Sequence, residues 1–189
     1  MNPEISLKEI KTSDEKMIEF KNYESILVVE DAKSLRVTVN HILKSLQENP
    51  VIYINLINTY NSLISNLKKD EIKTDNIFFI DCITQLAGGD VSEQENVLFI
   101  RGAPDLTSLE IAISQLFERI PGEKWLVLYA MRILKIYNKE DTVLRFIQSI
   151  LGNASRNNAK IVVLSTKLKD ARLIKKAAQF FEKVVMEVE

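Results

Sequence analysis

The chain has 189 residues, with 25 lysines and arginines against 26 aspartates and glutamates, one histidine and one cysteine. Hydrophobic residues make up 46% and charged residues 27%, close to the average of globular proteins, which argues against a disordered or fibrous chain. The formal net charge of −1 gives no overall basic field, so we expect no nucleic-acid partner. The single cysteine, Cys82, excludes an internal disulfide and a cysteine-rich zinc site.

The first 22 residues differ from the rest of the chain. They are polar and only weakly periodic, and they predict an N-terminal arm or helix in front of one domain over residues 23–189. The charged beginning has no secretory signal pattern. The longest uninterrupted apolar run, residues 125–131, is far shorter than the roughly 20 residues needed to span a bilayer. We therefore expect a cytoplasmic protein with no membrane partner.

Apolar runs alternate with stretches of helical period, which is typical of an α/β layered domain. Several runs are apolar on consecutive residues, as in a parallel sheet that helices cover on both faces. The predicted strands are residues 26–30, 51–55, 76–81, 97–100, 125–129, 160–165 and 184–188. The predicted helices are residues 34–48, 108–120, 141–151 and 170–181. The pattern predicts a three-layer fold with a mainly parallel central sheet.

Two helix ends carry local sequence signals. Thr107 precedes Glu110 by three residues, which is the spacing of a capping box at the start of the second predicted helix. Gly152 follows the third predicted helix, where we expect a residue of positive φ to end it.

The junction after the first strand, residues 30–37, reads EDAKSLRV. Ligands of open parallel sheets bind beyond the carboxyl ends of the strands, so a phosphate-binding loop would lie here. Such a loop needs the pattern GxxxxGK[ST], because its glycines let backbone N–H groups wrap the anion. No stretch of the chain matches this pattern, and the first glycine is Gly88. Glu30 and Asp31 also add negative charge where a triphosphate would sit.

These residues alone leave two interpretations open. Ordinary nucleotide binding has been lost at this junction, or the junction is a simple turn between strand and helix in an unrelated α/β fold.

The order and spacing of the segments resemble the RecA-type ATPases of the KaiC-like group, which occur in archaea and bacteria. The resemblance rests on ESILVVEDAKSLRVTVNHILKSL, VIYINLINTYNSLISNL, NIFFIDCIT, DLTSLEIAISQL, KWLVLYAMRILKIYNKEDTVLRFIQSIL, KIVVLSTKLKD and VVMEV, which together cover about residues 24–188. The most specific stretches are DLTSLEIAISQL and IYNKEDTVLRFIQSIL. The resemblance implies a RecA-like three-layer domain.

Carried onto this chain, the resemblance implies a degenerate phosphate loop. Glu30 stands at the first glycine, Leu35 at the last glycine, Arg36 at the lysine and Val37 at the serine or threonine. Only a positive charge survives, and arginine does not replace lysine in general. The degenerate positions together are Glu30, Asp31, Lys33, Ser34, Leu35, Arg36 and Val37.

Two further parts of the ATPase machinery are missing in the same comparison. Residues 56–58 read LIN, with no carboxylate to activate a water molecule, and Tyr129 stands where an aspartate would help to hold magnesium. A phenol of pKa near 10 is a poor magnesium ligand. The resemblance therefore implies a scaffold without phosphoryl-transfer chemistry. We expect no cofactor, and ATP with magnesium only if an unconventional site exists.

Three other residues have ordinary and functional interpretations. Asp81 is the one carboxylate left at a strand end facing the crevice, and it is either a residual ligand or a turn residue that holds backbone N–H groups. Cys82 is expected to be a buried small residue rather than a reactive thiol. His41 has no second histidine or cysteine at ligand spacing, so we expect an ordinary residue of a helix face.

Residues 132–139 mix cations with apolar side chains after the strand that ends at Tyr129. In RecA-type rings the corresponding loop tends to face the central channel and contact partners, so one interpretation is a docking or self-association surface. The other is a solvated loop whose apolar side chains pack onto the domain. The interaction candidates are Arg132, Lys135, Tyr137 and Lys139. The expected partner is a protein, either different or a second copy of the chain.

Three functions remain open from the sequence. The first is a non-catalytic RecA-like module for regulation or assembly. The second is an unconventional nucleotide site in which Lys33 and Arg36 hold phosphate at a helix N-terminus. The third is a receiver-like signalling domain with Asp81 as phosphate acceptor, near Asp31 and Lys167. Strand order separates the third from the other two, since a receiver sheet runs 2-1-3-4-5 whereas a RecA-type core separates its first two strands.

Overall fold

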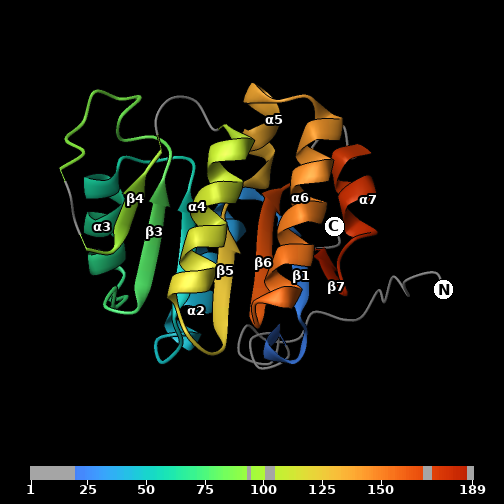
Figure 1. Ribbon diagram of the computed structural model, residues 1–189, viewed down its shortest axis with the longest axis horizontal. Helices are drawn as coiled ribbons and strands as arrows, with labels where there is room; N and C mark the ends of the chain where they lie inside the picture. The colour runs from blue at the N-terminus through green and yellow to red at the C-terminus, as the bar shows by residue number, and fades with distance from the viewer. Residues whose placement is uncertain (1–19, 93–94, 101–104, 168–171, 187–189) are drawn as a thin grey trace.

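The computed structural model describes residues 20–92, 95–100, 105–167 and 172–186, and these form one sheet with helices around it (Figure 1). The strands are β1 (Ser25–Glu30), β2 (Val51–Asn55), β3 (Ile77–Asp81), β4 (Val97–Phe99), β5 (Lys124–Leu128), β6 (Ala159–Thr166) and β7 (Lys183–Met186). The α-helices are α2 (Ala32–Ser45), α3 (Tyr60–Lys69), α4 (Leu106–Arg119), α5 (Leu134–Tyr137), α6 (Glu140–Arg156) and α7 (Arg172–Ala178). Two 3-10 turns, η1 (Phe20–Asn22) and η2 (Met131–Ile133), complete the described elements.

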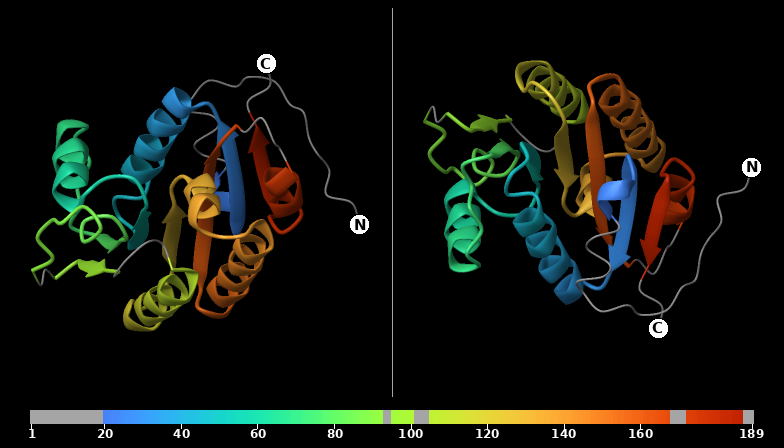
Figure 2. Two further views of the ribbon diagram at one scale, coloured as in Figure 1. Left: turned by 90° about the horizontal axis from the view of Figure 1, so that it is seen from above. Right: turned by 90° about the horizontal axis from the view of Figure 1, so that it is seen from below.

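The sheet forms the middle of three layers. Helices α2 and α3 cover one face, and α4, α6 and α7 cover the other (Figure 2). Successive residues of β1 feed the two cores, with Ile26 and Val28 under α2 and with Leu27 and Val29 on the opposite face. Every described strand pair is parallel. The three-layer α/β fold with a parallel sheet is confirmed.

The strand order is β4-β3-β2-β5-β6-β1-β7. Helix α2 therefore carries the chain from β1 past β6 and β5 to β2, so the first two strands are not neighbours. This order differs from the 2-1-3-4-5 arrangement of a receiver sheet. The receiver-like alternative is wrong at the level of topology. The separation of β1 from β2 is the one expected of a RecA-type core.

Helix α4 begins earlier than predicted, and its cap is Asp105 rather than Thr107. The Asp105 carboxylate accepts hydrogen bonds from the backbone N–H groups of Thr107 and Ser108, and from Ser108 Oγ at 2.6 Å. The Ser108 hydroxyl and N–H lower the pKa of this carboxyl group. One carboxylate thus satisfies three donors at the helix start, whereas Thr107 lies inside the first turn.

Helix α6 does not end at Gly152, as predicted, but runs on to Arg156. Gly152 does not have a positive φ. The left-handed residue lies further on, at Asn158, which has a φ of 52°. The helix continues because Ala154 extends its buried face. Asparagine tolerates the left-handed region better than most residues do, so Asn158 ends the helix where the glycine was expected to.

Two helical segments were not predicted as helices. Helix α3 buries only Leu63 and Leu67, a stripe too short to stand out in the sequence. Residues 131–137, expected as a loop, form η2 and α5.

The N-terminal arm or helix over residues 1–22 stays a prediction, since residues 1–19 lie outside the described ranges. Phe20 in η1 is buried, and its ring contacts Trp125 edge to face, with the two ring centroids 5.2 Å apart.

No helix in the described part of the chain has both the length and the apolar character needed to cross a bilayer.

Candidate functional site: the crevice above the sheet

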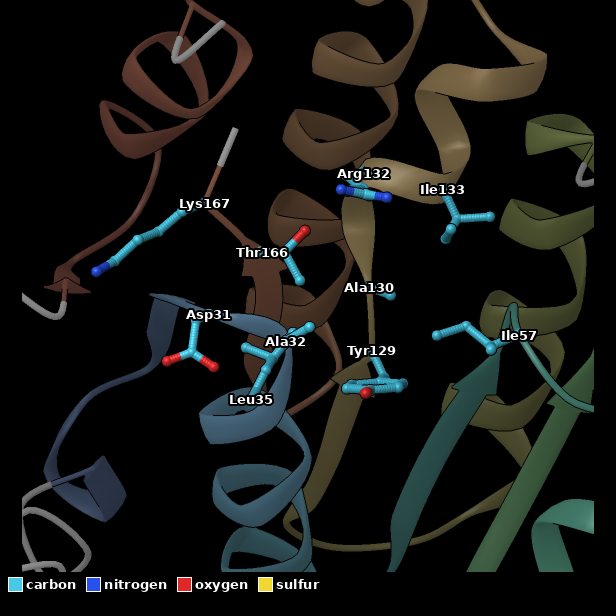
Figure 3. Close-up of a pocket in the computed structure, with 10 residues that line it drawn as sticks. All are labelled: Asp31, Ala32, Leu35, Ile57, Tyr129, Ala130, Arg132, Ile133, Thr166 and Lys167. Atoms are coloured by element: carbon cyan, nitrogen blue, oxygen red, sulfur yellow. The ribbon is translucent and has the colours of Figure 1, made fainter. Parts of the chain in front are cut away.

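A pocket of about 380 Å³ opens at the carboxyl ends of four neighbouring strands, β2, β5, β6 and β1 (Figure 3). Ligands of open α/β sheets bind at this edge. The pocket is lined by Asp31, Ala32, Leu35, Ile57, Tyr129, Ala130, Arg132, Ile133, Thr166 and Lys167. The structure therefore brings residues 31 and 35 of the predicted loop to the pocket, together with Tyr129 and Arg132.

The amino end of α2 is closed by the side chain of Asp31. Asp31 Oδ1 accepts hydrogen bonds from the N–H groups of Lys33 at 2.8 Å and Ser34 at 3.0 Å, and Ser34 Oγ donates to Asp31 Oδ2 at 2.8 Å. The N–H of Leu35 donates to the Asp31 carbonyl at 2.9 Å. Free N–H groups at a helix start are what binds an anion. Here the N–H groups of Lys33 and Ser34 already have a side-chain acceptor, and that of Leu35 makes the first bond within the helix.

Arg36, which stands at the lysine of the phosphate loop in the family comparison, bonds elsewhere. Its Nη2 lies 3.3 Å from Asp70 Oδ2, at the end of α3, and Asn40 Nδ2 donates to the same oxygen at 2.8 Å. The hydrogen bond from Asn40, followed by that from Arg36, lowers the pKa of Asp70 despite the opposing effect of burial. This contact joins α2 to α3, and Arg36 does not line the pocket.

The other predicted loop positions are also dispersed. Glu30 is buried at the end of β1, and its Oε2 accepts from Thr38 Oγ1 at 2.6 Å. Lys33 is exposed, and the side chain of Val37 is exposed on the outer surface of α2. Neither residue lines the pocket. The seven positions therefore do not converge on one point where a phosphate group could lie.

Tyr129 follows β5 and forms part of the pocket wall. Its ring stacks on Tyr53 at a centroid distance of 6.5 Å and an interplanar angle of 27°. Burial raises the pKa of the Tyr129 phenol, and the charge of Arg36 only partly opposes this. The phenol is therefore neutral near neutral pH, and it presents a weak oxygen ligand where a carboxylate would bind a hard cation.

Asp81 lies at the end of β3, in a buried polar cluster outside the pocket. Its Oδ1 accepts from the N–H groups of Ile83 at 2.9 Å and Thr84 at 2.7 Å, and its Oδ2 accepts from Asn55 Nδ2 at 2.7 Å. The Thr84 hydroxyl accepts in turn from the Tyr60 N–H. Asp81 thus stabilises the turn after β3, the ordinary role that the sequence also allowed.

The three residues of the receiver-like hypothesis do not meet. Asp31 and Lys167 both line the pocket, but Asp81 does not, and the strands that carry Asp81 and Asp31 have three other strands between them. This separation follows from the strand order, and it removes the proposed phosphate acceptor from its acidic and basic neighbours.

The two remaining candidates have the expected surroundings. Cys82 is fully buried, and burial together with the charge of Asp81 raises its pKa to about 12, so its thiol is unreactive. His41 lies within α2 and is partly buried. In the described parts of the chain, no three histidine, cysteine or carboxylate side chains are grouped as metal ligands.

The predicted interaction segment has two sides. Leu134 is fully buried against the domain, whereas Ile136 and Tyr137 of α5 are 67% and 50% exposed. Arg132 lines the pocket, and Lys135 contacts Glu140 Oε2 at 3.4 Å. Lys139 is exposed and directly precedes α6.

Glu140 connects α5, α6 and α7 through ion pairs. Besides Lys135, its carboxylate lies 3.1 Å from Arg172 Nε and 3.2 Å from Lys176 Nζ. Burial opposes ionisation of Glu140, but the hydrogen bonds of Lys176 and Lys135 and the charge of Arg172 outweigh this effect. They hold the pKa of Glu140 below its ordinary value of 4.5.

Sequence reasoning missed half of the residues in the pocket wall. Ile57, Ala130, Ile133 and Thr166 follow or end three different strands, and only the sheet order brings them together. Ala130 is also unusual, because it is not a glycine and yet has a φ of 65°. The only sequence signal was general, since loops at the carboxyl ends of parallel strands surround ligand sites.

Comparison with known proteins identifies the fold. No protein-family model and no curated protein sequence matches the chain. The uncharacterized protein PH0321 from Pyrococcus horikoshii, crystallised in complex with an unknown peptide, has a TM-score of 0.66 and 13% identity, over 87% of this chain and 77% of its own. The KaiC-like protein PH0186 from Pyrococcus horikoshii OT3 has a TM-score of 0.61 and 9% identity, over 86% and 70%. The chain therefore has a KaiC-like, RecA-type fold.

The role of Asp81 predicts a loss of stability in Asp81→Ala. The N–H groups of Ile83 and Thr84 and the Asn55 amide lose their acceptor, so the free energy of unfolding should fall by about 2–4 kcal/mol in urea denaturation. Asp90→Ala is the matched control, since Asp90 also accepts from a turn N–H, that of Ser92, but is exposed. It should change stability by less than about 1 kcal/mol. Equal effects of the two variants would contradict a buried structural role.

The ion pairs of Glu140 predict a pH dependence of stability. Because its pKa is lowered on folding, Glu140 contributes stability above its ordinary pKa of 4.5 and loses it as the pH falls through the lower folded value. The urea midpoint of Glu140→Gln should therefore lie below that of the unaltered chain at about pH 7, and the difference should shrink below about pH 4.

Asp141→Asn is the control for this measurement, because the Asp141 side chain is 77% exposed and makes one longer contact, 3.7 Å, with Lys176. It should show a much smaller pH-dependent difference. A Glu140→Gln difference that stays constant from neutral to acid pH would show that the charge of Glu140 is not what stabilises this corner.

Proposed function

We propose that this chain is a non-catalytic RecA-like domain that acts through protein contacts, as a regulatory or assembly module. The observation that carries the proposal is the capping of α2 by Asp31, at the point where a P-loop ATPase binds phosphate. Three further observations support it. They concern the positions at which P-loop ATPases have a phosphate-binding cation, a general base and a metal ligand.

Electrostatics favour this proposal over a nucleotide site. A phosphate at the start of α2 would compete with the Asp31 carboxylate for the Lys33 and Ser34 N–H groups. Two like charges about 4 Å apart near a protein surface repel by up to about 4 kcal/mol. The attraction of a helix N-terminus for an anion is about 0.3–1 kcal/mol at an exposed site, so repulsion is the larger effect.

The cation and the other reacting groups support the same conclusion. Arg36, the only cation left at the loop positions that carry the family chemistry, pairs with Asp70. The segment after β2 offers Asn58, whose carbonyl and N–H bond to Asn55, in place of a carboxylate base. Tyr129 replaces the metal carboxylate. Phosphoryl transfer depends on positioning and electrostatic stabilisation by such groups.

Exposed side chains next to the crevice support a role in protein contacts. Ile136 and Tyr137 are large apolar groups on α5 that remain exposed, with the charged Lys139 beside them. Interface cores are enriched in tyrosine and in apolar residues, with charged residues at their rims. A relative in fold, PH0321, is described in complex with an unknown peptide, which agrees with a peptide or protein partner. The partner is a different protein or a second copy of this chain.

The proposal predicts no ATP hydrolysis above a protein-free blank and no change of melting temperature on addition of Mg·ATP. If Mg·ATP did bind, a concentration of 100 times its dissociation constant would stabilise the fold by about 2.7 kcal/mol, which a thermal scan detects. We expect no such stabilisation, because Asp31 caps α2, Arg36 pairs with Asp70 and Tyr129 stands in place of the metal carboxylate.

Arg36→Ala separates this proposal from an unconventional nucleotide site. In the proposed module, the variant loses the contact with Asp70 and responds to Mg·ATP no differently from the unaltered chain. Stoichiometric ATP binding with a micromolar dissociation constant, weakened by Arg36→Ala, would overturn the proposal and favour the nucleotide alternative.

A further inference from the structure

We propose that the crevice pocket binds a ligand with a single carboxylate on an apolar body, held by Arg132 and Thr166. This inference concerns a binding site and goes beyond the proposed loss of ATP chemistry. It rests on the volume of the pocket and on what its two ends offer.

The polar end of the pocket consists of Arg132 and Thr166. In the part of the chain that the structure describes, the Arg132 guanidinium has no hydrogen-bond or ion-pair partner, although it lines the pocket. The Thr166 hydroxyl oxygen is buried and makes no hydrogen bond to any described residue. Figure 3 shows this oxygen on the side of Thr166 that faces Arg132. Buried polar atoms normally have partners, so an unpaired hydroxyl in a pocket wall indicates a ligand or water.

The rest of the wall is largely apolar. Leu35, Ile57 and the ring of Tyr129 surround the end of the pocket away from Arg132, and Ile133 closes one side (Figure 3). A volume of about 380 Å³ is at the lower end of the range for small-molecule sites, which hold ligands among apolar side chains with a few polar groups. The occupant therefore has an apolar body and one polar group.

The charges favour a carboxylate over a phosphate. Arg132 supplies one positive charge with a planar pair of donors, which matches the two oxygens of a carboxylate. Lys167 lines the pocket with its stem, and its ammonium points away from Arg132 in Figure 3. Asp31 contributes a negative charge on the same side as α2. A doubly charged phosphate would meet one guanidinium, one hydroxyl and a repelling carboxylate, with the N–H groups of Lys33 and Ser34 already bonded.

The backbone at Ala130 is a second sign of a built site. Ala130 is buried, lines the pocket and has left-handed dihedral angles, with φ 65° and ψ 52°. Residues other than glycine in this region are strained, and such strain is concentrated at binding and catalytic sites. The turn at Ala130 directs the chain into η2, which carries Arg132 to the pocket wall.

The test uses 4-phenylbutyrate as the probe, with ¹⁵N-labelled full-length protein and the amide signals of Ala130 and Ile133 as the readout. Binding with a dissociation constant on the order of 1 mM is expected for an acid of this size. Arg132→Gln should weaken binding at least about tenfold, and Thr166→Val about threefold. Arg119→Gln, the same change at the opposite end of α4 from the crevice, should leave the dissociation constant unchanged.

Matched probes test the chemistry and its source. The neutral 4-phenylbutyramide should bind at least about tenfold more weakly than the acid, and 4-phenylbutylphosphonate no more tightly. A peptide ending in Leu-Phe with a free carboxylate, compared with its C-terminal amide, distinguishes a protein terminus from a small acid as the natural source. The inference would be overturned if neither 4-phenylbutyrate nor the peptide with a free carboxylate bound, or if an acid and its amide bound equally. Tighter binding of the phosphonate, or a dissociation constant unchanged by Arg132→Gln, would also overturn it.

Discussion

The hydrogen bonds from Asp31 to the start of α2 are the constraint on which the interpretation of the crevice depends. A helix begins with N–H groups that have no partner within the helix, and its dipole attracts negative charge there. Proteins that bind phosphate at this point leave those groups for the ligand. In this chain Asp31, the residue between β1 and α2, supplies the negative charge itself. An aspartate is a good helix cap, and we propose that a phosphate would find the Lys33 and Ser34 N–H groups occupied.

The other departures at the crevice are consistent with this first one. Arg36 stabilises the contact between α2 and α3 through Asp70, Tyr129 stacks on Tyr53, and Asp81 holds the turn after β3. Each of these residues has a contact of its own within the described structure. Arg132 and the Thr166 hydroxyl line the pocket without a partner among the described residues. The chain thus has a KaiC-like fold, and we propose that its pocket binds a carboxylate rather than a phosphate.

The layers of the fold could be predicted from the sequence, because strands buried on both faces are apolar on consecutive residues, as β2 and β5 are. Strand order has no such signal, and only the resemblance to a family implied that β1 and β2 are separated. Local signals failed where stronger contacts competed: Asp105 has more donors in reach than Thr107, and the buried Ala154 extends α6 past Gly152. The pocket could not be derived, because Ile57, Ala130 and Thr166 become neighbours only through the sheet order.

The most direct test of this account follows the backbone amides of Lys33 and Ser34 by NMR during a titration with inorganic phosphate. Their hydrogen bonds to Asp31 predict no saturable shift in the unaltered chain. In Asp31→Ala the two amides lose their acceptor, and they should then respond to phosphate. Saturable shifts of both amides with Asp31 in place would contradict the account, because the start of α2 would then be open to an anion.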